Sequence, residues 1–278
     1  MKMTKKGIMN TVITMAAILL VACGANTSKE TSSAEQSTSP VLNQIKEKGT
    51  LVIGTSADYP PFEWHLVKDG KDTVVGYDID ISNAIAEKLG VKLEVKEMEF
   101  GSLVAAVKTG KIDMAIAGMN PTEERAKEVD FSKVYYETDI IAVIRKSDAS
   151  KYTTFESLDG AKVGAQKGTV QEEIAIKNLP KAEVISQPKN NTLILALQQN
   201  KVDAVVMDKV VAEEFIKADD TLMVAPFATP AEKSGSAVAV QKNNEAFLAE
   251  IQAVLDELAS SGQLDKFMVK NTELMSEQ

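Results

Sequence analysis

Asn120 to Arg125 is a short segment whose residue types and spacing suit the binding of a carboxylate. It follows an apolar run, and we predict that it opens a helix, with Asn120 as N-cap, Pro121 at the first helical position and Glu123 at the capping-box position. Unpaired amides at a helix N-terminus attract anions, and the planar Arg125 guanidinium can hold both oxygens of a carboxylate. Spacing alone also fits the commoner case, a surface arginine on an amphipathic helix.

Thr169-Val170-Gln171-Glu172 is a second Ser/Thr-x-x-Glu capping box, placed after the apolar run Lys162–Gln166. It predicts a second helix N-terminus that could meet an anion. A structural cap without ligand contact is the alternative.

Asp208 ends the apolar run Val202–Met207 and precedes the helical pattern Lys209–Lys217. A carboxylate there faces the crevice outside the carboxyl end of a strand, where open α/β sheets bind ligands. Asp208 could instead cap the following helix. Both roles are compatible because a carboxylate has two oxygens.

Short β-rich runs alternate with helical patterns along most of the chain. The predicted strands are Leu51–Ile53, Val91–Val95, Ile112–Ala117, Asp139–Ile144, Lys162–Gln166, Glu183–Ser186, Val202–Met207, Thr221–Ala225 and Ser236–Val240. The predicted helices are Tyr77–Leu89, Ser102–Thr109, Val170–Leu179, Asn190–Gln199, Lys209–Lys217 and Glu245–Ser260. This alternation favours an α/β fold with largely parallel sheets. Lys111–Ala117 resembles Lys201–Met207, which indicates two lobes of similar topology or a chance likeness of buried strands.

The composition is that of a soluble globular protein, with 278 residues, 44% hydrophobic and 26% charged. It excludes a wholly disordered chain and a polytopic membrane protein. A net charge of −9 leaves no basic excess for nucleic acid. One His and one Cys exclude a Cys/His zinc site and an intramolecular disulfide, and a Ser-His-Asp mechanism would depend on His65 alone. No cofactor and no metal are expected.

Residues 1–22 are predicted to be a signal peptide, with lysines followed by an apolar stretch too short to span a bilayer. The stretch ends in Leu20-Val21-Ala22-Cys23, which resembles the bacterial lipobox and implies cleavage before Cys23 and a lipid on its sulfur. A signal anchor with an incidental cysteine is the alternative. Residues 23–44 are expected to be a flexible tether, because most of them are small or polar. We expect a lipid-anchored protein on the outer face of a membrane, in a cell of the Gram-positive type.

Seven further segments occur in a characteristic order: Gly49–Glu63, Gly76–Asp80, Gly110–Asp113, Gly118–Arg125, Val129–Ser132, Gly168–Glu172 and Val202–Asp208. In these the chain resembles the bacterial solute-binding proteins for polar amino acids, solute-binding protein family 3. The resemblance implies a two-lobed fold of the periplasmic-binding-protein type II, with two hinge strands. Lobe 1 would comprise residues 45–137 plus 235–278, and lobe 2 residues 138–234.

The resemblance also implies a ligand site. Arg125 would clamp the α-carboxylate of the ligand together with the Thr169 turn, and Asp208 would take the α-ammonium group. Tyr59 and Phe100 would be aromatic walls around the ligand side chain. The remaining matched positions are Gly118, Asn120, Val170, Ser56 and Asp78.

The ligand side chain is predicted from Asp78 and Ser56. Asp78 matches a position near the far end of a cationic ligand in some relatives. Ser56 stands where histidine- and lysine-binding relatives carry an acid, which argues against a basic ligand. We therefore expect a polar or cationic L-amino acid, arginine or glutamine ahead.

The predicted function is a monomeric receptor that delivers a free amino acid to an ABC importer. The permease and ATPase would be separate chains, since no Gly-x-x-x-x-Gly-Lys-Ser/Thr loop occurs here. The alternatives are a sensor or adhesin without transport, and an enzyme on the same fold such as a cyclohexadienyl dehydratase. An enzyme would need an acid or base beyond the clamp.

Overall fold

The computed structural model describes residues 39–231 and 234–276, which belong to one compact unit. The predicted signal peptide, Cys23 and most of the predicted tether lie outside the described residues. Among the described residues, no helix is both long and apolar enough to cross a membrane.

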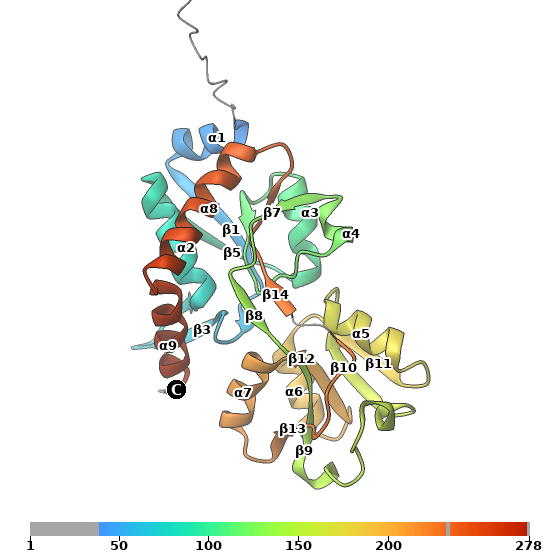
Figure 1. The fold of residues 1–278 in the computed structure, drawn as a ribbon. Coiled ribbons are helices and arrows are strands. Elements are labelled where there is room, and N and C mark those ends of the chain that lie inside the picture. Colours follow the sequence, from blue (N-terminus) through green and yellow to red (C-terminus); the bar gives the residue numbers. More distant parts are fainter. Residues whose placement is uncertain (1–38, 232–233, 277–278) are drawn as a thin grey trace, which may run out of the picture. The chain divides into compact units, whose positions relative to one another are not determined.

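The first sheet gathers strands from both ends of the described chain (Figure 1). Its strands, in spatial order, are β5 (Lys92–Glu97), β1 (Thr50–Thr55), β6 (Met114–Ala115), β15 (Ala239–Gln241) and β7 (Val129–Phe131). β1 runs parallel to β5 and β6, whereas β15 is antiparallel to β6 and β7. The sheet is therefore mixed rather than largely parallel.

Both α-helices and a 3₁₀ turn accompany the first sheet. Glycines with a left-handed backbone follow α1 and α2, and their N–H groups bond to carbonyls of the last helical turn. The helices are α1 (Pro40–Lys48), α2 (Tyr77–Leu89), α3 (Leu103–Lys108), α4 (Glu123–Ala126), α8 (Glu245–Ser260) and α9 (Gln263–Ser276), with the 3₁₀ turn η1 (Phe100–Ser102). A three-stranded antiparallel sheet contacts α2 and comprises β2 (Asp58–Tyr59), β3 (Glu63–Lys68) and β4 (Lys71–Val75).

The second sheet uses only the middle of the chain. Its strands, in spatial order, are β11 (Glu183–Gln187), β10 (Lys162–Gln166), β12 (Ala204–Asp208), β9 (Ile140–Arg145) and β13 (Leu222–Val224). β10 is parallel to β11 and β12, and β9 is antiparallel to β12 and β13. Its helices are α5 (Val170–Asn178), α6 (Asn190–Gln198) and α7 (Lys209–Ala218), with the 3₁₀ turns η2 (Lys146–Asp148) and η3 (Phe155–Leu158).

Two short strands connect the sheets. β8 (Tyr136–Thr138) and β14 (Ser234–Ser236) pair antiparallel, and Figure 1 shows them side by side between the two sheets. After β8 the chain passes from the first sheet to the second and continues as β9. After β14 it returns to the first sheet and continues as β15. Each crossing thus adds an antiparallel strand to the sheet that it enters. The fold is thus the expected two-lobed one, with lobe 1 around the first sheet and lobe 2 around the second. The residue limits predicted for the lobes remain a proposal.

The internal likeness of Lys111–Ala117 and Lys201–Met207 corresponds to equivalent places in the two sheets. β6 and β12 each stand third in their sheet, parallel to one neighbour and antiparallel to the other. The likeness therefore reflects two lobes of similar topology.

The predicted tether extends too far into the folded part. Residues 40–44 lie in helix α1, which Ser39 caps by accepting the Leu42 N–H. Leu42 and Ile45 are buried against lobe 1, because α1 is amphipathic.

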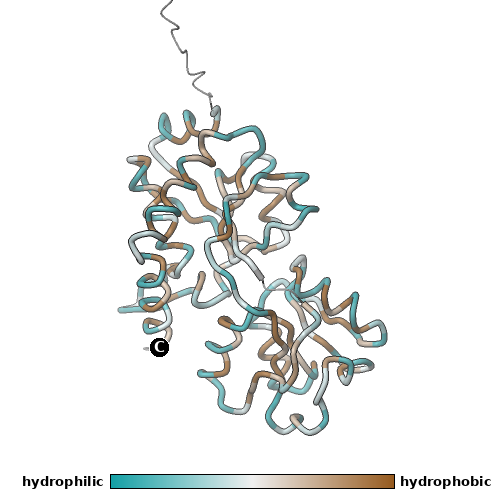
Figure 2. Tube along the Cα trace, viewed as in Figure 1, coloured by the Kyte–Doolittle hydropathy of each residue, from teal (hydrophilic) through white to brown (hydrophobic). Residues whose placement is uncertain are grey.

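The core follows the strands. Figure 2 shows hydrophobic residues concentrated along the strands of both sheets, with hydrophilic residues along the outer turns. The central strands β1, β9 and β12 are buried along most of their length, as expected for strands covered on both faces. Rigid sheets of this kind can hold loop residues at their carboxyl ends in fixed positions.

Candidate functional site

Arg125 lies in the four-residue helix α4 and touches both lobes. Its Nη1 donates to the Asn120 carbonyl at 2.7 Å, and its Nη2 donates to the Gly168 carbonyl of lobe 2 at 2.9 Å. The guanidinium carbon lies 5.2 Å from the centroid of the Phe100 ring. Burial lowers the pKa of the guanidinium, which is nevertheless always charged. The sequence-predicted Arg125, Phe100 and Thr169 turn therefore meet in one place.

The cap of this helix is not the predicted one. Thr122, and not Asn120, is the N-cap of α4, and its hydroxyl accepts the Arg125 N–H at 3.2 Å. The extended residue before a helix satisfies the amide three positions later, and Thr122 to Arg125 has that spacing. The Asn120 side-chain amide instead donates to the Gly235 carbonyl at 3.1 Å.

The Thr169 cap agrees with the prediction in part. Its hydroxyl accepts the Glu172 N–H at 3.2 Å and donates to the Gln166 carbonyl at 2.7 Å. The Glu172 carboxylate accepts the N–H of Gly168 at 2.6 Å, rather than that of Thr169 itself. Val170 follows as the first residue of α5. The N-terminus of α5 therefore lies against the turn that Arg125 contacts.

Asp208 is fully buried at the end of β12. It occupies the N-cap position of α7, but its side chain makes no capping hydrogen bond. Its Oδ1 accepts from Gln171 Nε2 at 2.7 Å, and its backbone N–H donates to the Tyr59 hydroxyl of lobe 1 at 3.4 Å. The carboxylate thus bonds to α5, and the backbone N–H bonds to Tyr59, which favours a site role over a helix cap.

Tyr59 and Gly118 lie close together in lobe 1. A Cβ on Gly118, whose φ is +56°, would be 3.0 Å from the Tyr59 ring. Glycine is therefore required there by both the backbone conformation and the close approach of the ring. The Tyr59 ring stacks on Phe62 at 5.8 Å between centroids.

Asp78 is fully buried in the first turn of α2. Its carboxylate accepts the Gly118 N–H at 2.9 Å and the Tyr135 hydroxyl at 2.8 Å. Burial raises the pKa of Asp78 to about 7, against the opposing effect of these donors. The structure therefore gives Asp78 partners in lobe 1, where it supports the Gly118 loop.

Glu63 is a candidate site residue that the sequence does not single out. It is fully buried, and β2 pairs with β3 so that Tyr59 stands opposite Glu63. Its Oε1 accepts from the Ser56 hydroxyl at 3.4 Å, and its Oε2 has no hydrogen-bond partner among the described residues. Burial raises the pKa of Glu63 well above its usual range, and the carboxylates of Asp78 and Asp58 raise it further.

The sequence signal for Glu63 was weak. It stands seven residues after Ser56, beyond two prolines, and only the hairpin of β2 and β3 brings it back beside Tyr59. The sequence pattern does not predict that hairpin, so Glu63 stands out only as part of the longer motif Gly49–Glu63.

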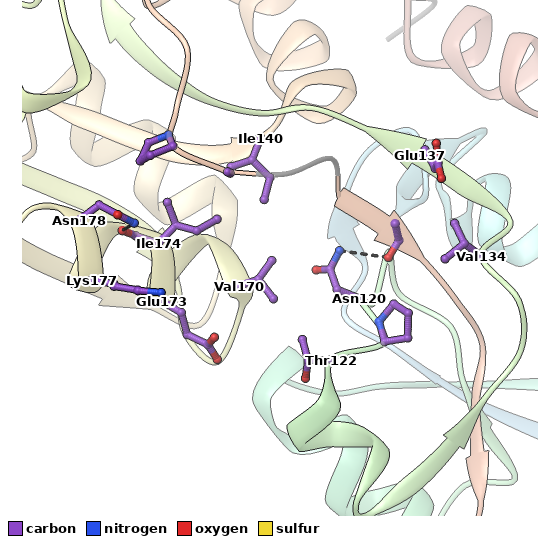
Figure 3. Close-up of a pocket in the computed structure, with 14 residues that line it drawn as sticks. Asn120, Thr122, Val134, Glu137, Ile140, Val170, Glu173, Ile174, Lys177 and Asn178 are labelled. Carbon is purple, nitrogen blue, oxygen red and sulfur yellow. Dashed lines mark hydrogen bonds between the residues drawn. The ribbon is translucent and has the colours of Figure 1, made fainter.

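A groove of about 610 Å³ lies at the outer side of this site (Figure 3). Figure 3 shows Asn120 and Thr122 on one side and Val170 on the other, and the Asn120–Gly235 hydrogen bond lies on the Asn120 side. Neither Tyr59, Glu63 nor Asp208 lines this groove. It therefore borders the Asn120 end of the site, away from the buried carboxylates.

The fold and site define a two-lobed binding protein whose lobes share polar contacts at the carboxyl ends of their strands. Residues 51–272 match the family described as bacterial extracellular solute-binding proteins, family 3, and the chain belongs to that family.

Solved and curated relatives agree with this assignment. The chain is 34% identical to the arginine-binding extracellular protein ArtP of Bacillus subtilis, over 96% of this chain and 97% of that protein. It is 33% identical to a probable histidine-binding protein of Campylobacter jejuni, over 96% and 98% of the two chains. The crystal structure of the substrate-binding protein AbpA of Streptococcus pneumoniae, bound to L-arginine, superposes with a TM-score of 0.82 at 37% identity, covering 84% of this chain and 98% of that one. These relatives are binding proteins, and this chain is a solute-binding protein and not an enzyme.

Proposed function

We propose that this protein binds L-arginine outside the cell and delivers it to an ABC importer. Arg125 and the N-terminus of α5 would hold the α-carboxylate, since a guanidinium and helix amides converge there. Asp208 would take the α-ammonium group, with Tyr59 beside it. Charged groups of both lobes would thus bind the α-carboxylate and α-ammonium end of the ligand.

The buried Glu63 is the main reason to propose a ligand with a cationic side chain. Glu63 Oε2 is buried with no hydrogen-bond donor among the described residues, which is costly, and a ligand guanidinium would supply both a charge and donors. Asp58 and Asp78 add negative potential around Glu63. Ser56 alone argued against a basic ligand, but its hydroxyl bonds to Glu63, so the acid comes from the neighbouring strand.

The ligands of the relatives support the same choice. ArtP is named for arginine, AbpA was solved with L-arginine, and the Campylobacter protein is named for histidine. Glutamine remains the runner-up, because its amide could also bond to Glu63. A sensor without transport is separated from the proposed function by uptake assays in a strain lacking the protein.

Ligand analogues test the clamp. L-Arginine should stabilise the protein by about 2.7 kcal/mol at a hundredfold excess over its dissociation constant. Its methyl ester should lose most of this effect, because Arg125 and α5 lose their anion, and Nα-acetyl-arginine should lose it through Asp208. Thermal denaturation with each compound is the measurement. Equal stabilisation by arginine and its methyl ester would reject the clamp.

We also propose that the mature protein is held on the cell surface by a lipid on Cys23. The support is the leader and its Leu20-Val21-Ala22-Cys23 end. More than one acyl chain gives stable anchoring. Cys23→Ser is expected to move the protein from the membrane to the soluble fraction, or to leave it uncleaved, as measured by fractionation and intact mass. Wild-type protein that keeps residues 1–22 would contradict the proposal.

A further inference from the structure

Asp58 joins the two lobes through contacts other than those proposed to hold the ligand's α-carboxylate and α-ammonium groups. Its carboxylate is 2% exposed, and its Oδ2 accepts the N–H of Asn190, the first residue of α6, at 2.5 Å. Its Oδ1 lies 3.5 Å from Gln166 Nε2, which also donates to the Pro188 carbonyl at 3.1 Å. One buried carboxylate of lobe 1 is therefore bound by two segments of lobe 2.

Helix α6 has no cap from its own segment. Lys189 occupies its N-cap position and makes no side-chain capping bond. The first amides of a helix need acceptors, and an aspartate is among the best of them. We propose that Asp58 is a latch residue, which caps α6 of the opposite lobe and so stabilises the closed protein around its ligand.

A second, more exposed contact lies beside the first. Lys189 Nζ is 3.0 Å from Glu97 Oε1, and His65 lies between the carboxylates of Glu97 and Asp72 at 3.0 and 2.9 Å. The Lys189 side chain is 53% exposed, and exposed ion pairs contribute little. The buried Asp58 cap is therefore the stronger part of the latch.

The latch acts on opening through the Asn190 N–H, separately from the negative potential that Asp58 adds around Glu63. When the lobes separate, α6 loses its acceptor, so the cost falls on the step that releases the ligand. Asp58 is a positioning residue in this scheme, because it works through α6. Most effects of this kind appear in the dissociation rate.

Asn190→Pro tests the latch without changing the charge of the site. Proline lacks the N–H that Asp58 accepts, and it suits the first position of a helix. Lys189 is already extended, with φ −123° and ψ 133°, as the residue before a proline requires. Asp58→Ala removes the acceptor instead. L-Arginine dissociation, measured by stopped flow, should be about tenfold faster or more in each variant. The double variant should match Asp58→Ala, because the Asn190 N–H has no Asp58 acceptor left to lose once that carboxylate is gone.

Asp130→Ala is the matched control. Like Asp58, its carboxylate accepts a backbone N–H, that of Asn243, and it also pairs with Lys242, but entirely within lobe 1. It should leave the dissociation rate within twofold of wild type. The measurement rests on the proposed function, and a wild type that does not bind L-arginine would overturn that function alone. In that case the latch is tested by the radius of gyration of the ligand-free protein, which should be larger in Asn190→Pro. Equal values for wild type and Asn190→Pro overturn the latch. Rates within twofold of wild type in a folded Asn190→Pro protein, or additive effects in the double variant, also overturn it.

Discussion

Arg125→Ala is expected to weaken L-arginine binding strongly while the fold is retained. The guanidinium contacts both lobes through one side chain, at Asn120 and Gly168. Loss of a desolvated, charge-assisted contact to the ligand carboxylate should cost about 2–5 kcal/mol. That corresponds to a fall in affinity of roughly thirtyfold to several thousandfold. Isothermal titration calorimetry measures it directly.

The control for this variant is the folded state. Helix α4 keeps its Thr122 cap in Arg125→Ala, since that cap uses the backbone N–H of residue 125. Circular dichroism and the unfolding temperature of the ligand-free protein should therefore be close to wild type. Arg125→Lys should recover only part of the binding, because an ammonium lacks the planar fork. Wild-type affinity in folded Arg125→Ala would remove the carboxylate clamp from the proposed site.

Local signals predicted much of the fold. The bounds of α2 were predicted because its apolar period ends at Gly90, whose left-handed backbone closes the helix. The β2–β4 sheet was missed because β4 and most of β3 lack buried residues, which leaves no alternating pattern to read. The predicted start of α4 lies two residues before the observed one, because Asn120 and Thr122 are both good N-caps.

Long-range contacts explain why the site was predicted only in part. Arg125, Thr169 and Asp208 each follow a strand, and the carboxyl ends of strands gather ligand sites in this fold class. The partnership of Glu63 with Asp58 and Asp78 depends on how a hairpin and a helix pack, and no spacing in the sequence encodes it. The contact of Asp58 with Asn190 likewise joins segments that only the closed fold brings together.

Glu63→Gln is expected to reverse the preference of the site between a cationic and a neutral ligand of the same shape. L-Citrulline has the length of arginine without its charge. The variant keeps the size of Glu63 and its contact with Ser56, but it removes the charge that would pair with a guanidinium. Arginine affinity should fall by about a hundredfold, in line with 2–5 kcal/mol for a buried charge pair, while citrulline affinity should not fall. Calorimetry with both ligands gives the two changes.

The pH dependence of the same pair of ligands gives an independent check. Burial and the carboxylates of Asp78 and Asp58 raise the pKa of Glu63 well above its usual range, so the ligand-free site holds its proton at a pH where an exposed glutamate does not. A bound guanidinium favours the ionised carboxylate, so arginine binding should release a proton and strengthen as pH rises. Burial also raises the pKa of Asp58 to about 6 and that of Asp78 to about 7, so part of this trend between pH 5 and 8 should persist in Glu63→Gln. Calorimetry in buffers of different ionisation enthalpy counts the protons released on binding.

Two outcomes would show that Glu63 does not contact the charge of the ligand. One is a wild type that binds arginine with no proton release. The other is a Glu63→Gln protein that loses affinity for citrulline as severely as for arginine.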